Sequence, residues 1–122
     1  MSLEVDTSVT YKPYTSMTKR AQPPHAGDLI RLIRQLAAAD KISWSDHAFD
    51  ERSHERGIEL HDVIEVLRLG DIEGEIVPGK KAGEWRCLVV GKLRWTSREA
   101  GIATVVVRKD RLIVVTVEWM DP

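Results

Sequence analysis

Residues 84–119, EWRCLVVGKLRWTSREAGIATVVVRKDRLIVVTVEW, decide the expected fold because apolar side chains recur there at nearly every second position. A shorter run of the same kind precedes them at 72–77. Turn-forming residues interrupt the alternation at Pro78-Gly79, Gly91, Gly101 and Lys109-Asp110. The pattern therefore predicts four strands, at 72–77, 84–90, 102–108 and 112–119.

The upstream half of the chain has the 3.6-residue period of helices instead. Apolar residues at helical spacing predict a helix over 27–39 and another over 60–69. Between them, Ser45 is a typical N-cap and Gly57 a typical residue after a helix end, which predicts a helix over 45–57. Helices followed by strands predict an α+β fold, with a mainly antiparallel four-stranded sheet and about three N-terminal helices packed on it.

The last two strands are close enough in the chain to form a hairpin. A two-residue turn at Lys109-Asp110 would place Leu112 and Val114 on the face opposite Ile102 and Val106. Both faces of the hairpin would then be apolar, so we expect central strands that are covered on both sides. We also expect Trp119 in the core.

The 122 residues, of 13.8 kDa, fit a single domain. Residues 1–24 are rich in Ser, Thr, Tyr and Pro and predict a flexible N-terminal arm, which leaves 25–122 as the domain. No stretch approaches the roughly 20 apolar residues of a transmembrane helix, and the first residues lack the pattern of a secretory signal. With Cys87 as the one cysteine, no internal disulfide is possible, and we expect a cytoplasmic protein without a membrane partner.

The net charge of -1 hides two blocks of opposite sign. Residues 40–79 carry a net charge of -7, and residues 80–111 carry +6. A basic surface on a neutral protein is compatible with an anionic partner that is met locally. The alternative is that the acidic and basic blocks pair with each other.

Two residues of the predicted helix 45–57 are candidates for chemistry. His47 shares a helix face with Asp50 and Glu51, and a neighbouring carboxylate suits a proton-transfer group. The alternative is that His47 anchors the helix start. Arg52 either clamps a phosphate or compensates the helix dipole. A metal-dependent hydrolase using His47, Asp50 and His54 is a further hypothesis, although no second cluster completes a tetrahedral site.

The predicted strands and turns supply further cations. Arg86 lies on a face of a predicted strand and not at a loop tip, so its charge calls for an explanation. Lys80 and Lys81 occupy the turn before it. A basic loop with an interleaved aromatic follows, formed by Lys92, Arg94, Trp95 and Arg98. Such a loop can hold a base by stacking and its phosphates by charge, although solubility alone would also place cations there.

The chain resembles the domain-of-unknown-function family 4258 (DUF4258) over residues 42–119. The resemblance rests on His47-Ala48, Arg52, Glu55-Arg56-Gly57-Ile58, Asp62-Val63, Gly83-Glu84-Trp85-Arg86 and the closing VVTVEW of residues 114–119. Glu51 occupies the position of the first arginine of the family pattern, and Arg52 follows it.

That family is similar to the RelE/MqsR-like toxins. The resemblance implies that fold and an RNA-cleaving toxin of a type II toxin–antitoxin pair. It also implies a mechanism without metal or cofactor, RNA that is free or ribosome-bound, and neutralisation by an antitoxin, in relatives often of the zinc-finger type.

Metal-independent RNA cleavage needs a base for the ribose 2′-hydroxyl, cations for the phosphorane and an acid for the leaving 5′-oxygen. We therefore assign His47, Arg52 and Arg86 as candidate catalytic residues. The predicted RNA-binding residues are Lys80, Lys81, Lys92, Arg94, Trp95 and Arg98. The alternative function is a non-catalytic module of the same fold that binds RNA or a protein.

Overall fold

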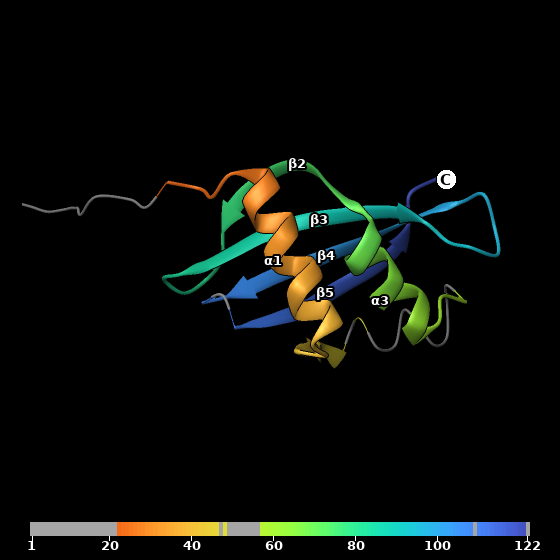
Figure 1. Cartoon of the computed structure of the whole chain (residues 1–122), viewed down its shortest axis with the longest axis horizontal. Coiled ribbons are helices and arrows are strands. Elements are labelled where there is room, and N and C mark those ends of the chain that lie inside the picture. Colours follow the sequence, from red (N-terminus) through yellow and green to blue (C-terminus); the bar gives the residue numbers. More distant parts are fainter. Residues whose placement is uncertain (1–21, 47, 49–56, 109, 122) are drawn as a thin grey trace, which may run out of the picture.

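The computed structural model describes residues 22–46, 48, 57–108 and 110–121, which form one α+β unit (Figure 1). Its elements are α1 (Ala26–Ala38), β1 (Ile42–Trp44), α3 (Leu60–Leu69), β2 (Asp71–Pro78), β3 (Glu84–Lys92), β4 (Glu99–Val107) and β5 (Arg111–Trp119). The strands form a single five-stranded sheet in the order β1-β5-β4-β3-β2. The pairs β2–β3, β3–β4 and β4–β5 are antiparallel, and β1 pairs parallel with β5.

The α+β class is confirmed, but the predicted four-stranded sheet is wrong. The extra strand is β1, which has only three residues and pairs Ser43 with Ile113. The sequence predicts only a short extended link at 41–44, because three residues are too few to show the alternation of a strand. The helices predicted at 27–39 and 60–69 are present as α1 and α3.

The helix predicted at 45–57 lies mostly outside the described residues, but both of its predicted ends can be checked. Ser45 Oγ accepts a hydrogen bond from the Ala48 backbone N–H at 3.0 Å, as expected of an N-cap. Gly57 has a φ of 69°, the left-handed conformation that favours glycine after a helix end.

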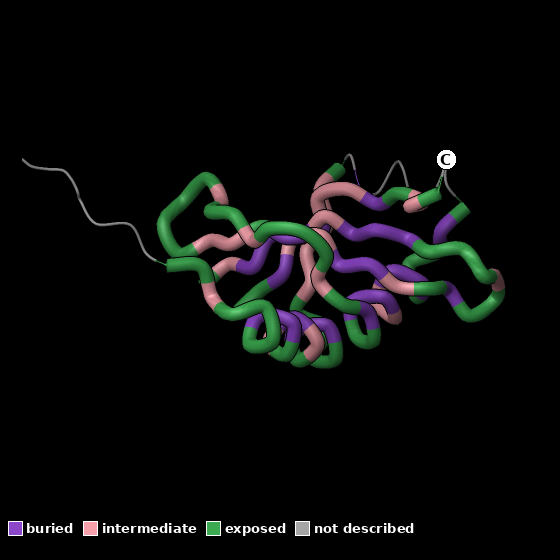
Figure 2. The backbone as a smooth tube through the Cα atoms, turned by 90° about the horizontal axis from the view of Figure 1, so that it is seen from above, coloured by how far each residue is buried: buried purple, intermediate pink, exposed green. Residues whose placement is uncertain are grey.

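α1 and α3 cover the same face of the sheet (Figures 1 and 2), and their buried residues belong to one core cluster with those of the strands. The core lies between these layers. Its fully buried side chains include Ile33, Ile58, Val63, Leu67, Val89, Ile102, Val106, Leu112, Val114 and Val117. Burying each such side chain contributes about 1.5–3 kcal/mol, so this one interface supplies most of the apolar burial that the described part shows.

The hairpin of β4 and β5 differs from the prediction in its register. Val107 pairs with Arg111, so the turn has three residues, and a bulge then inserts Val115 between Val114 and Thr116. The hydroxyl of Ser45 donates a hydrogen bond to the Val115 carbonyl at 2.9 Å, which satisfies an acceptor at the bulge.

This register places Leu112 and Val114 on the helix-covered face together with Ile102 and Val106, so the predicted separation of these residues was wrong. Val105 and Ile113 pair with each other and belong to the opposite face. Neither α1 nor α3 covers that face of the sheet (Figure 2). The prediction for Trp119 is confirmed in part, since it is half-buried and packs against the core.

The junction between α3 and β2 requires a glycine. Gly70 follows α3 with ordinary negative φ, so its requirement is for space and not for backbone freedom. A Cβ at this position would lie 2.5 Å from the Val90 carbonyl oxygen and 2.7 Å from that of Val66. The end of α3 therefore lies directly against the backbone of β3. Arg34 of α1 also donates a hydrogen bond to the Gly70 carbonyl, at 2.9 Å.

We predict that Gly70→Ala lowers the free energy of unfolding by about 1–3 kcal/mol, the usual cost of overpacking. Urea unfolding followed by circular dichroism measures the change. The control is Gly27→Ala in α1, where nothing lies within 4 Å of an added Cβ. That variant should be as stable as the parent, or more stable by up to about 1 kcal/mol. Equal midpoints for the two variants would contradict the close approach at Gly70.

Candidate nucleic-acid interface

A groove of about 500 Å³ lies between α3 and the loop 93–98, which connects β3 with β4. His61, Asp62, Ile64, Glu65 and Arg68 line it from α3, and Arg94 and Trp95 line it from the loop. The α3 residues 61, 65 and 68 share one helix face because their spacing is i, i+4 and i+7. This spacing could have identified the α3 residues from the sequence, but the sequence analysis predicted only the loop residues as part of a binding site.

A buried carboxylate, that of Asp62, joins the two walls of the groove. Asp62 is 1% exposed. Its Oδ2 accepts a hydrogen bond from the Glu59 backbone N–H at 3.0 Å, which is half of the capping box at the start of α3. Its Oδ1 accepts one from the Trp95 indole Nε1–H at 3.2 Å. A buried carboxylate is costly unless it is paired in this way, so the cap and the indole together keep Asp62 in place.

Trp95 exposes more than half of its side chain although its indole N–H is anchored. Its exposed fraction is 58%. Its ring meets that of Trp119 edge to face, with the centroids 6.0 Å apart and the planes at 85°. A large aromatic surface held at its edges and open to solvent is suited to stacking against a planar ligand.

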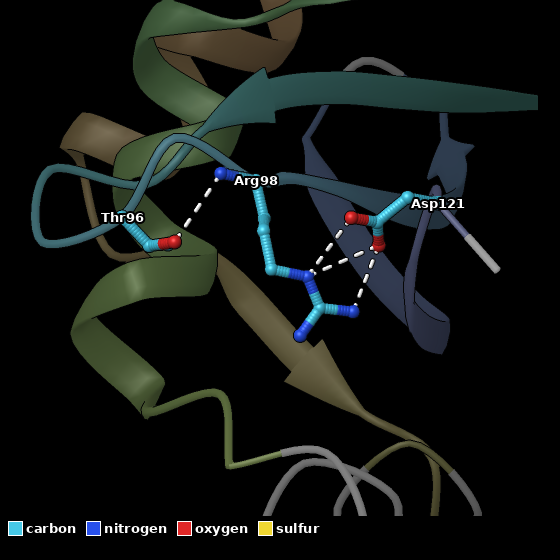
Figure 3. A network of polar contacts seen from close by, with 3 residues as sticks. All are labelled: Thr96, Arg98 and Asp121. Atoms are coloured by element: carbon cyan, nitrogen blue, oxygen red, sulfur yellow. Dashed lines mark hydrogen bonds and ion pairs between the residues drawn. The ribbon is translucent and has the colours of Figure 1, made fainter.

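Arg98 binds the end of the chain instead of pointing freely into solvent (Figure 3). Its Nε and Nη2 donate three hydrogen bonds of 2.8–3.1 Å to the carboxylate of Asp121. Its guanidinium also lies 4.0 Å from the centre of the Trp119 ring. The hydrogen bonds with Asp121 raise the pKa of Arg98 and lower the pKa of Asp121. The role of Arg98 that the structure shows is therefore to hold Trp119 and the C-terminal segment beside the loop.

Arg94 forms an ion pair with Glu65 of α3, across the groove. Glu65 belongs to the acidic block of the sequence and Arg94 to the basic block, so here the two blocks do pair. Lys92 is exposed at the end of β3. Arg68 is exposed and lines the groove from α3.

The other predicted cations lie at the far end of the sheet. Lys80 and Lys81 are exposed in the turn between β2 and β3, and Arg86 is exposed near the start of β3. Arg86 pairs across the sheet with Val105, on the face away from the helices. β3 has nine residues and is therefore about 30 Å long. The predicted RNA-binding residues thus form two separate groups, with Lys80 and Lys81 at one end of β3 and the cations of the loop 93–98 at the other.

His47 and Arg52 lie outside the described residues, as do Asp50 and His54 of the metal hypothesis, so their geometry remains a prediction. Among the residues that the structure does describe, no group of three or more His, Cys, Asp or Glu could hold a metal ion.

Cys87 is buried in the core, and burial raises the pKa of its thiol to about 11. It therefore stays protonated at neutral pH and is a poor nucleophile.

Comparisons with protein-family models, with curated proteins and with solved structures gave no match. The resemblance to DUF4258 and the RelE/MqsR-like fold therefore remain predictions from the sequence. In the described part of the chain, no helix is long and apolar enough to cross a membrane.

We predict that Asp62→Asn lowers the free energy of unfolding by about 1–3 kcal/mol, the cost of an unsatisfied buried donor. The amide would replace one of two acceptor oxygens, so either the Glu59 N–H or the Trp95 N–H would lose its partner. Chemical unfolding monitored by tryptophan fluorescence measures the loss. Asp110→Asn is the isosteric control, because Asp110 is exposed in the hairpin turn. The same midpoint for both variants would contradict a structural role of Asp62.

Proposed function

We propose that this protein is a metal-independent, RNA-cleaving toxin that binds single-stranded RNA in the groove between α3 and the loop 93–98. The observation that carries the binding site is the exposed ring of Trp95, fixed through Asp62 and bordered by Arg68 and Arg94. Stacking of an unpaired base on an aromatic ring contributes about 1–3 kcal/mol.

The cations around Trp95 fit the phosphates on either side of a stacked base. Arg68 and Arg94 reach the groove from opposite walls, and Lys92 lies one position before the loop. Guanidinium groups bind phosphate bidentately, which adds geometric selectivity to charge. Because the overall charge is only -1, binding depends on this local set and not on a field around the whole molecule.

The cleavage activity rests on the resemblance of residues 42–119 to DUF4258. The candidate catalytic residues from the sequence are His47, Arg52 and Arg86, with no metal or cofactor. Arg86 lies at the other end of β3 from the groove, so cleavage within the groove itself does not use it. In this proposal the toxin acts on free or ribosome-bound RNA in the cytoplasm and is held inactive by a cognate antitoxin, which in similar proteins is often of the zinc-finger type.

The second candidate function is a non-catalytic module that binds RNA or a protein at the same surface. It is favoured by the ion pairs of the loop, since Arg94 and Arg98 already have carboxylate partners in the free protein. The two functions differ in whether bound RNA is cut.

We predict that the purified chain cuts single-stranded RNA in the presence of EDTA and arrests growth when it is expressed without a partner.

Trp95→Ala should weaken binding of a non-cleavable, 2′-O-methylated oligonucleotide by about 5- to 150-fold, which corresponds to 1–3 kcal/mol of stacking. Fluorescence anisotropy with a dye-labelled oligonucleotide measures the affinity.

The control for Trp95→Ala is Val77→Ala, which removes an exposed apolar side chain of β2. This variant should bind as the parent does. Equal affinities for the parent and Trp95→Ala would place the RNA site elsewhere. Binding without cleavage and without growth arrest would establish the second function instead of the first.

We also predict that Glu65→Gln strengthens RNA binding by up to about fivefold at low salt, the equivalent of a surface ion pair of at most 1 kcal/mol. The RNA phosphate and the Glu65 carboxylate compete for Arg94, and the substitution removes the competitor. Glu75→Gln on β2 is the control, because it makes the same change of charge outside the groove. The same gain in both variants would reflect net charge alone and would contradict a specific exchange at Arg94.

A further inference from the structure

We propose that His61 is a proton-transfer group of the RNA-cleaving reaction, and that Asp62 is its positioning residue. This assignment rests on the proposed function and goes beyond it, because it adds a catalytic residue within the groove. His61 lies in the first turn of α3, and its side chain is 77% exposed, so it is accessible to a bound ligand.

The side chains of His61 and Trp95 approach the same atom, Oδ1 of Asp62. His61 Nε2 lies 3.4 Å from Asp62 Oδ1, the same oxygen that accepts the Trp95 indole N–H at 3.2 Å. The imidazole and the indole therefore flank one carboxylate oxygen. In the proposed complex, a nucleotide whose base stacks on Trp95 has its ribose within reach of His61, which lines the same groove.

Asp62 is suited to orient the imidazole because the carboxylate itself cannot turn freely. One of its oxygens is held by the Glu59 backbone N–H and the other by the Trp95 indole. Nε2 of the imidazole lies beside Asp62, and His61 lines the groove. One ring nitrogen can therefore contact the carboxylate while the other exchanges a proton with a ligand.

The charges that face His61 complete the requirements of the reaction. On α3 these are Asp62, Glu65 and Arg68, and on the loop the charge is Arg94. The two arginines can stabilise the extra negative charge of a phosphorane. The Glu65 carboxylate pairs with Nε of Arg94 in the free protein, so it competes with phosphate for this guanidinium.

In the proposed step, the ribose 2′-oxygen attacks phosphorus while its proton passes to a base. The bond between phosphorus and the 5′-oxygen breaks, and the leaving 5′-oxygen takes a proton from an acid. The products are a 2′,3′-cyclic phosphate and a 5′-hydroxyl, so water, metal and oxidant are not consumed. His61 serves as the base when its imidazole is neutral and as the acid when it is protonated.

The test compares RNA cleavage by the parent, His61→Ala and His25→Ala. His25 precedes α1 and is exposed away from the groove, so it is the matched control. We expect His61→Ala to cut at least about 100-fold more slowly, the usual contribution of proton transfer. Its affinity for the 2′-O-methylated oligonucleotide should stay within about threefold of the parent, and added imidazole should restore part of the rate. His25→Ala should cut at the parent rate.

A second substrate identifies the step. RNA with sulfur in place of the leaving 5′-oxygen needs no acid, so His61→Ala should cut it at nearly the parent rate if His61 is the acid, and slowly if His61 is the base. Parent-like cleavage of ordinary RNA by His61→Ala would overturn the assignment and leave the proposed function standing. A slow variant that neither imidazole nor the sulfur substrate restores would also overturn it, because His61 would then be structural. A parent that does not cut RNA would overturn both.

Discussion

The buried carboxylate of Asp62 is the interaction on which the candidate site depends. It caps the first turn of α3 through Glu59, holds the edge of Trp95 and faces His61. These contacts join a helix to a loop 33 residues further along the chain. A residue that is 1% exposed thus connects the start of α3, the edge of Trp95 and the neighbouring His61. The position of Trp95 in the site therefore depends on a buried contact.

The packing around α3 limits where the groove can lie. Gly70 allows the end of α3 to meet the backbone of β3, and the buried residues Val63, Val66 and Leu67 hold its inner face on the sheet. The exposed face of α3 is then left to border the loop 93–98. Trp119 and Arg98 support this loop from the other side, since Arg98 connects it to Asp121. Core packing and the polar network thus act on the same short loop.

Much of the fold could be predicted because long segments carry their period in the sequence. α1, α3 and the four longer strands were identified in this way, whereas β1 is too short to have a period. The bulge at Val115 was not predicted because the hairpin is apolar on both faces. A shift of register therefore leaves the pattern of apolar residues unchanged. Its contact with Ser45 joins residues 70 positions apart, and no local pattern reports such a pair.

The candidate site was predicted less completely, for similar reasons. Trp95 and its neighbouring cations were identified from their composition, but the carboxylate partners of Arg94 and Arg98 come from distant elements. Lys80 and Lys81 were predicted to bind RNA together with the loop cations, but β3 places them at the opposite end of the sheet. His61 was not among the predicted site residues, because its relation to Trp95 passes through Asp62 and exists only in the folded chain.

The central claim is that RNA binds at the groove organised by Asp62. The most direct test is a nuclear magnetic resonance titration of the ¹⁵N-labelled chain with a 2′-O-methylated, single-stranded RNA oligonucleotide. The account predicts that the Trp95 indole N–H signal and the backbone amides of residues 61–68 and 93–98 shift together, while those of residues 80–83 do not. Shifts confined to residues 80–83 and Arg86, with the Trp95 indole unchanged, would contradict it.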